Sequence, residues 1–265
     1  MNQYHNVQVV AFTKGIIEDM DTVEKVVGYT ARVSNPDNQK NFHTMSSLLK
    51  YCFRKKHFSV FDMGNVLIEI NTSRTISRQI LRHSSIRPQE FSQRYATVMP
   101  EVVMSECRVQ DTKNRQNSFV TDDVELQEWW ANAQLQVHEF TTEKYQQAID
   151  KGIAKEQARN LLSEGLTPTR MYMNGTIRSW ITFCLVRCGI ETQAEHRHIA
   201  KEICKLLLDH VPSLGGLLAK CLEDDYKAEQ EDLTLILEMA VQSGDERGEI
   251  VRLIEKAVPS VTGLL

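Results

Sequence analysis

The spacing of apolar residues predicts both strands and helices in this chain. Residues 7–12 form a short apolar run, and residues 65–71 alternate so that Val66, Ile68 and Ile70 share one face, as in a half-buried strand. Helical spacing recurs at residues 23–27, 45–53, 126–137, 177–185, 199–210 and 233–241, and a third strand is predicted at 169–173. The pattern therefore indicates an α+β fold.

For two of these helices the sequence predicts which side chains face the core. The helix at 126–137 is expected to begin at Asp122 or Asp123, because either side chain can cap its first turn. Its core-facing positions by spacing are Leu126, Trp129, Trp130, Ala133 and Val137. In the helix at 177–185, the apolar spacing leaves Arg178 off the buried face.

The composition changes towards the C-terminus. Beyond Tyr226 the chain turns acidic and glutamine-bearing, and apolar spacing at 233–241 and 250–254 predicts two helices there. We therefore expect one main domain at residues 1–225, followed by a C-terminal helical extension at residues 226–265.

Three arginines recur every four residues in the middle of the chain. On a helix, Arg74, Arg78 and Arg82 form a positive stripe, while Ile76 and Ile80 face the core. The positive charges of such a stripe repel one another unless an anion neutralises them, so the stripe is a candidate binding site for phosphate. The alternative is a solvated basic face.

The overall composition narrows the class of protein. The chain has 265 residues, 42% of them hydrophobic, and a formal net charge of −4. These values are typical of an ordinary globular protein and disfavour bulk nucleic-acid binding. No apolar run has the length of a membrane span and no secretion signal is recognised, so a cytoplasmic location is expected.

No metal site is expected from the sequence. The six cysteines form no CxxC pair, and Cys184 and Cys188 lie one helical turn apart, which predicts reduced thiols in the core. His196 and His198 point to different faces of a helix and lack the spacing of a helical zinc pair. Glycine-rich nucleotide-binding motifs are absent as well.

One segment, residues 82–95, combines cations, hydroxyls, a carboxylate and an amide around a proline. It reads Arg82-His83-Ser84, then seven residues, then Ser92-Gln93-Arg94-Tyr95. This spacing resembles the signature of the flavin-dependent thymidylate synthases, in which Arg-His-Arg is followed after seven residues by Ser and then by Arg-Tyr. Ser84 stands where that family has arginine.

The resemblance covers roughly residues 5 to 222 and includes Ala31-Arg32-Val33-Ser34, residues 113–118, Arg178-Ser179-Trp180-Ile181 and residues 192–197. It implies that family's fold, a mixed sheet with long helices, and a homotetramer with active sites between subunits. It also implies an enzyme that converts dUMP to dTMP with FAD, NADPH and methylenetetrahydrofolate. No membrane partner is expected.

Site residues are carried over from the family by position. The residues that match nucleotide-binding positions are Gln79, Arg82, Glu90, Ser92, Gln93, Arg94, Arg159 and Arg187. Those that match flavin-contacting positions are Ser34, Ser59, Asp62, Arg82, His83, Ser84, Ser85, Arg178 and Arg187. The resemblance gives catalytic roles to Arg187, Ser92 and His57, the last beside folate and flavin.

Departures from the family pattern leave two other functions open. Arg87 stands where the family usually has serine, and Thr176 and Thr182 stand where asparagine or histidine is frequent. Ser84 and Arg87 are three residues apart, which suggests the hypothesis that the guanidinium missing at position 84 has moved one turn along the chain to Arg87. A related hydroxymethylase acting on dUMP is one alternative, and a non-catalytic nucleotide or nucleic-acid binding protein on the same fold is the other.

Overall fold

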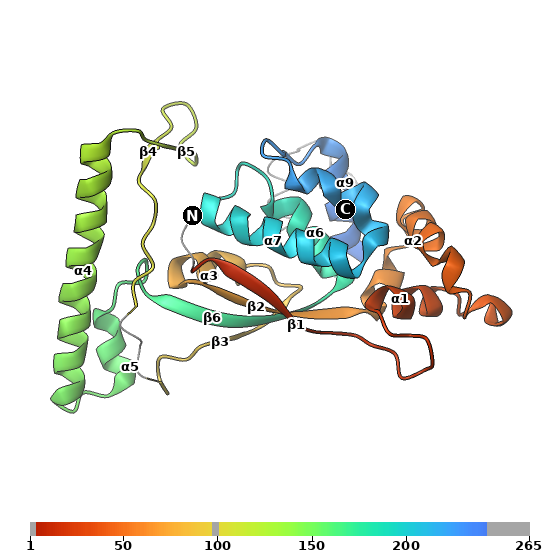
Figure 1. Cartoon of the computed structure of the whole chain (residues 1–265), viewed down its shortest axis with the longest axis horizontal. Helices are drawn as coiled ribbons and strands as arrows, with labels where there is room; N and C mark the ends of the chain where they lie inside the picture. The colour runs from red at the N-terminus through yellow and green to blue at the C-terminus, as the bar shows by residue number, and fades with distance from the viewer. Residues whose placement is uncertain (1–3, 97–100, 243–265) are drawn as a thin grey trace. The chain divides into compact units, whose positions relative to one another are not determined.

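The structure is a computed structural model, and it describes residues 4–96 and 101–242 (Figure 1). Contacts within the chain divide it into two compact units. The first unit comprises Met1–Asn6, Ile70–Ile80 and Gln89–Met171, and the second comprises Val7–Glu69, Leu81–Pro88 and Tyr172–Leu265.

The three strands predicted from the sequence are present. A four-stranded sheet has the order β1-β2-β6-β3, with bounds Asn6–Phe12, Asn65–Ser73, Pro168–Thr176 and Arg87–Glu90 respectively. Val66, Ile68 and Ile70 of β2 are all buried, which confirms the face predicted for that strand. The chain therefore has a mixed α/β architecture, as its sequence indicates.

The first unit holds the longest helix of the described residues. This unit contains α3 (Arg74–Ile80), α4 (Val124–Asp150), α5 (Lys155–Ala158) and the 3-10 helix η4 (Arg159–Leu161). Figure 1 shows α5 alongside the lower end of α4. Tyr145 and Ala148 of α4 form a small core there with Ala158 of α5, which fixes the short segment that carries Arg159.

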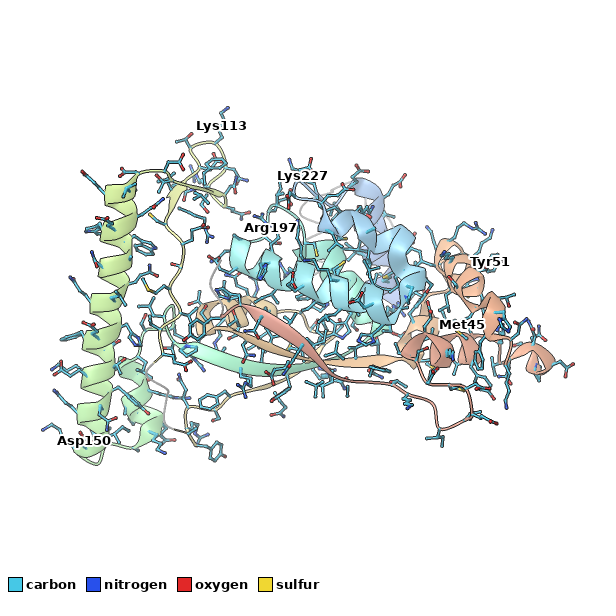
Figure 2. All side chains as sticks on the ribbon, in the orientation of Figure 1. Met45, Tyr51, Lys113, Asp150, Arg197 and Lys227 are labelled. Carbon is cyan, nitrogen blue, oxygen red and sulfur yellow. The ribbon has the colours of Figure 1, made fainter. Side chains whose placement is uncertain are left out.

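The polar run at residues 113–118 forms the turn of a hairpin in the same unit. Strands β4 (Arg108–Gln110) and β5 (Ser118–Val120) pair antiparallel, with Val109 opposite Phe119. The Asp111 carboxylate accepts hydrogen bonds from the backbone of Lys113 and Asn114, which shapes the turn. Lys113 projects from its tip (Figure 2).

Helix α4 begins where the sequence predicts, but the buried face predicted for it is wrong. Asp123 caps the helix by accepting a hydrogen bond from the Leu126 amide at 3.0 Å. Trp129 and Val137, which have core spacing, are 63% and 48% exposed. Phe140 is 61% exposed as well, so among the described residues much of the apolar surface of this helix is uncovered.

The second unit is mostly helical. It contains α1 (Val23–Ala31), α2 (Met45–Arg54), α6 (Ile177–Arg187), α7 (Ala194–His210), α8 (Gly215–Leu218) and α9 (Gln230–Gln242). Short 3-10 helices lie at Pro36–Asn38, Phe42–Thr44, Phe58–Met63 (η3), Pro212–Leu214 and Ala219–Leu222 (η6). Met45 packs closely on Gly28 of α1, and a larger residue would not fit there because a Cβ at Gly28 would lie 2.4 Å from Met45 Cγ.

Helix α6 is the centre of the second unit. All of residues 177–185 are buried, and α7 and α9 both pack against this helix (Figure 1). Ile236, Leu237 and Met239 of α9 are buried in turn. The helix predicted at 233–241 is therefore confirmed and covers part of α6.

The predicted C-terminal extension is described only in part. The helix expected at 250–254 lies outside the described residues, and the division at residue 225 stays a prediction. None of the helices in the described ranges combines the length and the apolar character needed to cross a membrane.

Candidate functional site

In the first unit, the Glu90 carboxylate collects hydrogen bonds from several elements. Its Oε1 accepts from Ser77 Oγ at 2.9 Å and from Thr169 Oγ1 at 3.0 Å. Its Oε2 accepts from an Arg78 guanidinium nitrogen at 3.0 Å. Both oxygens of this predicted nucleotide-binding residue are thus engaged, and Glu90 links strand β3 to α3 and β6.

The arginines of the predicted stripe form ion pairs with carboxylates of the protein itself. Arg74 is buried and donates through Nε to Glu164 Oε1 at 3.3 Å, and Arg78 Nε lies 3.8 Å from Glu164 Oε2. Helix α3 ends at Ile80, so Arg82 lies beyond it and does not extend the stripe as predicted. Two arginines, rather than three, form one cationic row.

A pocket of about 390 Å³ opens beside these arginines in the first unit. It is lined by Arg74, Arg78, Gln93, Arg159, Asn160, Leu162, Glu164 and Thr167. Three guanidinium groups in one hollow make it suited to an anionic group, since each offers directed donors to phosphate oxygens. Of the residues predicted to bind nucleotide, Arg159 and Gln93 line this pocket.

The remaining first-unit candidates lie outside the pocket lining. Arg94 is 61% exposed and its guanidinium lies 3.3 Å from the Glu156 carboxylate. Ser92 Oγ accepts from the Arg94 amide at 3.4 Å. Gln79 is half-buried on α3. Arg159 Nε donates to the Glu156 carbonyl at 3.2 Å, so Glu156 contacts both arginines.

In the second unit, two residues predicted to contact flavin, Arg178 and Asp62, form one hydrogen-bonded group with Thr176, which departs from the family pattern. Arg178 donates to Asp62 Oδ2 at 2.9 Å, and Thr176 Oγ1 donates to Asp62 Oδ1 at 3.2 Å. Arg178 also donates to the Met239 carbonyl of α9. The prediction that Arg178 lies off the buried face is wrong: it is 4% exposed, because Asp62 and Met239 supply its partners inside the unit.

Two buried histidines of the second unit are held neutral. Burial and the neighbouring charge of Arg187 lower the pKa of His83 to about 3. Burial and Arg187 likewise lower the pKa of His196 to about 3, with smaller contributions from His83 and Arg82. Arg187, the last residue of α6, is half-buried. Positive charge is therefore concentrated around two neutral imidazoles.

The predicted histidine His57 is positioned by the end of α2. Lys56 adopts a left-handed conformation with φ of 61°, its amide donates to the Phe53 carbonyl, and the His57 amide donates to the Cys52 carbonyl. This is a Schellman motif, which normally has glycine at the left-handed position. It turns the chain so that exposed His57 lies edge-on to Tyr51.

The other flavin candidates of the second unit are mostly accessible. Ser34 is exposed on a hollow of about 460 Å³ that Arg32 and Tyr51 also line. Ser59 and Ser84 are exposed, Arg82 is exposed beyond α3, and the carbonyl of half-buried Ser85 accepts from Ser179 Oγ at 3.2 Å. Their contacts with a flavin remain predictions.

Comparison with known proteins identifies the family. Residues 15–213 match the family model described as thymidylate synthase complementing protein. The chain is 44% identical over 211 residues to a probable flavin-dependent thymidylate synthase of Paramecium bursaria Chlorella virus 1, an alignment that covers 80% of this chain and 97% of the relative. The chain belongs to the flavin-dependent thymidylate synthase family.

A second relative and a solved structure agree with this assignment. The flavin-dependent thymidylate synthase of Synechocystis is 44% identical over 195 residues, covering 74% of this chain and 89% of the relative. A UMP/dUMP methylase from Streptomyces cacaoi, solved with 5-Br dUMP, superposes with a TM-score of 0.67 at 20% identity, covering 79% of this chain and 92% of that one. The latter likeness confirms the fold expected for the family.

Some pocket residues of this family member were missed by sequence reasoning. Asn160, Glu164 and Thr167 line the pocket without belonging to any recognised motif. Asn160 follows Arg159 directly, and the Thr167 carbonyl accepts from the Arg74 amide at 3.0 Å. A long-range pairing of this kind leaves no local signal in the sequence.

Proposed function

We propose that this chain is a flavin-dependent thymidylate synthase that converts dUMP to dTMP. Methylenetetrahydrofolate is the carbon donor, NADPH the reductant and FAD the redox cofactor. The observation that carries the proposal is the 44% identity to a relative named for this activity, over 97% of that relative's length.

The pocket of the first unit supports an anionic nucleotide as substrate. Arg74, Arg78 and Arg159 line it, and Glu90 and Glu164 hold two of these guanidinium groups in place. A phosphate that enters this pocket meets donors whose orientation is already fixed, so little ordering entropy is lost on binding. The phosphate of dUMP is the matching group.

The second unit offers groups that fit a flavin. The two ring nitrogens of His83 and the Nε2 of His196 are buried and have no hydrogen-bond partner among the described residues. Arg187 and Arg82 place positive charge nearby. Buried polar atoms without partners favour a bound polar group, and the cationic surroundings favour one with phosphates or an anionic reduced ring.

The work of the protein in this reaction is binding and orientation. When bound, the flavin supplies the hydride that reduces the transferred carbon. Arg159 and its neighbours hold the nucleotide, and we assign His57 to the folate side, where its exposed ring is free to stack on a planar group. His83 and His196, neutral at physiological pH, offer donors and acceptors without adding charge.

We further propose that the enzyme is a homotetramer. Trp129, Val137 and Phe140 of α4 are 63%, 48% and 61% exposed and lie on one face of the helix by their spacing. Apolar side chains grouped in this way favour burial against another subunit. Light scattering during gel filtration should give the mass of four chains, and Trp129→Glu with Phe140→Glu should give a smaller species.

The proposed activity is tested on the purified protein in two steps. A visible absorbance spectrum shows whether flavin is bound, and mass spectrometry identifies the nucleotide formed from dUMP, methylenetetrahydrofolate and NADPH. Bound flavin and dTMP are expected. Hydroxymethyl-dUMP instead of dTMP would establish the hydroxymethylase. A protein that stays colourless after reconstitution and forms no product would establish the non-catalytic binding function.

A variant of the pocket tests the assignment of the substrate site. Arg159→Ala should weaken dUMP binding about 10- to 100-fold, as expected for one charge-assisted contact, without loss of flavin. Arg170→Ala is the matched control, because Arg170 is an exposed arginine of the same unit that donates to Asn71 and does not line the pocket. Equal dUMP affinity of the two variants in calorimetry would refute the site.

A further inference from the structure

Three cysteines of the second unit converge on one point in its core. Cys184 lies on α6, Cys188 directly follows the end of that helix, and Cys204 lies on α7. Their sulfur atoms all lie within 4.8 Å of one another, and all three residues are 0% exposed. The helical spacing of Cys184 and Cys188 places both thiols on the face of α6 that α7 covers.

A fourth cysteine joins this group. Cys221 of η6 is 0% exposed, and its thiol lies near enough to the thiols of Cys188 and Cys204 for them to influence its pKa. The 3-10 helix η6 packs against α7, which brings Cys221 to the cluster although it lies 17 residues from Cys204 in the sequence. None of the four forms a disulfide. We call Cys184, Cys188, Cys204 and Cys221 the thiol cluster.

Ordinary core packing explains a single buried cysteine but not this arrangement. A cysteine in a core behaves as a small apolar residue and needs no sulfur neighbour, as Cys52 of the same unit illustrates. In the thiol cluster, three separate elements, α6, α7 and η6, bring their cysteine side chains together. Four thiolates at about 2.3 Å from a central zinc ion lie roughly 3.8 Å apart at the corners of a tetrahedron. The spacing of the Cys184, Cys188 and Cys204 sulfurs is compatible with three corners of that tetrahedron after a small contraction, and Cys221 is the nearby thiol available for the fourth corner.

We propose that Cys184, Cys188, Cys204 and Cys221 bind a single zinc ion in a closed structural site. Thiolates select soft or borderline ions, and four of them in tetrahedral disposition are typical of structural zinc. An iron–sulfur cluster contains several irons and spreads its cysteine sulfurs more widely than one ion does, so the compact spacing favours a mononuclear site.

The surroundings suit the negative charge of such a site. Lys201 lies one turn before Cys204 on α7, and its ammonium donates to the carbonyls of Leu222 at 3.2 Å and Glu223 at 2.7 Å, directly after Cys221. This cation offsets part of the charge that four thiolates leave on a divalent ion. Cys204 Sγ donates to the Leu218 carbonyl at 3.5 Å in the thiol form, a weak contact that metal binding replaces.

The zinc ion would fasten the end of α6 to α7 and η6. Arg187, predicted to contact both nucleotide and flavin, is the residue immediately before Cys188. A site at this position therefore fixes the backbone that carries Arg187, although the metal itself takes no part in the redox chemistry. The proposal does not depend on the activity proposed above, because it concerns a different set of side chains.

The metal content of the protein as purified tests the proposal. Protein from cells grown with zinc should contain roughly one zinc ion per chain by inductively coupled plasma mass spectrometry. The Cys204→Ser variant should lose the ion and unfold at a lower temperature. Cys52→Ser is the control, since Cys52 is buried in the same unit outside the thiol cluster and its loss should leave the zinc content unchanged.

A spectroscopic readout separates this site from zinc bound elsewhere. Cobalt(II) in place of zinc should give the intense visible absorption of a tetrahedral thiolate site, at wavelengths longer than the flavin bands. The Cys52→Ser variant should give the same absorption, because Cys52 lies outside the thiol cluster. The proposal is overturned by wild-type protein without zinc or cobalt absorption, or by zinc that persists in Cys204→Ser. If that variant fails to fold, the wild-type metal content and cobalt spectrum decide the question by themselves.

Discussion

Arg178 of α6 and Asp62 of η3 form an ion pair with 2.9 Å between guanidinium nitrogen and carboxylate oxygen, and the arginine side chain is almost completely buried. A buried cation requires partners, because removal from water costs several kcal/mol per ion. Asp62 and the carbonyl of Met239 provide them. A residue that the family resemblance assigns to the flavin is therefore also part of the packing of the second unit.

The Arg178–Asp62 pair should contribute measurably to stability. Asp62→Asn leaves the guanidinium buried with a weaker acceptor, so the free energy of unfolding should fall by roughly 2 to 3 kcal/mol, below the value for fully buried pairs because Asp62 is partly exposed. Asp21→Asn breaks the exposed pair with Lys25 and should leave the free energy of unfolding almost unchanged, because solvent screens that pair. Urea unfolding of both variants provides the comparison, and equal losses would contradict the expectation.

Removal of the C-terminal segment should expose part of α6. The domain division expected from the sequence predicts that truncation after Tyr226 leaves a folded, flavin-binding core. In the structure, Ile236, Leu237 and Met239 are buried and Met239 binds Arg178, so we expect this truncation to lower the free energy of unfolding by roughly 5 kcal/mol or more. Truncation after Gln242 retains α9 and is the control. Unchanged stability after the shorter truncation would favour an independent extension.

Arg94 should matter for nucleotide binding and hardly at all for folding. Its pair with Glu156 is exposed on both sides and contributes less than about 1 kcal/mol. If Arg94 binds the phosphate of dUMP, Arg94→Ala should weaken nucleotide binding by roughly 1.5 to 3 kcal/mol while thermal stability and flavin content remain. Calorimetric titration with dUMP measures the effect, and Glu156→Gln is the control for loss of the ion pair alone. Unchanged affinity of Arg94→Ala would refute the assignment.

Stability should fall as the solution becomes acidic, because His83 and His196 are buried as neutral groups. Their pKa values of about 3 lie below the ordinary value of 6.5, so between these values the unfolded chain binds more protons than the folded one. The contribution is complete above pH 6.5 and decreases below it. At about pH 5.5 the loss should be roughly 1.4 kcal/mol per histidine.

A histidine variant tests this pH dependence. Urea unfolding at about pH 7.5 and pH 5.5 should show a smaller pH-dependent loss in His196→Gln than in the wild type, even if the variant is less stable at both values. His43→Gln is the control, because His43 is exposed. An identical pH dependence in wild type and His196→Gln would show that His196 does not titrate in this way.

The departure at Ser84 makes a prediction about flavin binding. Arg87 begins strand β3, and Ser84 lies in the preceding turn; both side chains are exposed. If Arg87 has replaced the guanidinium missing at position 84, Arg87→Ser should reduce flavin affinity strongly, and addition of Ser84→Arg should partly restore it. Flavin titration of the four members of this cycle gives the coupling. Additive effects would show that the two positions act independently.

The thiol cluster and the arginine-lined pocket of the first unit illustrate different limits of sequence reasoning. Arg159 and Gln93 were predicted as nucleotide-binding residues from the family resemblance, and both line one pocket. The thiol cluster was predicted only as separate core thiols. Cys204 and Cys221 are distant from Cys184 in the sequence, and no local spacing indicates that their helices meet.

The sequence by itself determined the elements. Three examples are the alternation in β2, the cap at Asp123 and the helix at 233–241. Each depends on interactions between residues that are close in the sequence, so the local spacing of residue types predicts it. Tertiary structure decided which faces are covered. Trp129 has core spacing but is exposed, whereas Arg178 lies off the apolar face but is buried. The difference arises because burial depends on the partners that other segments provide. Asp62 and helix α9 provide hydrogen-bond acceptors for Arg178, whereas no segment among the described residues covers most of the Trp129 side chain.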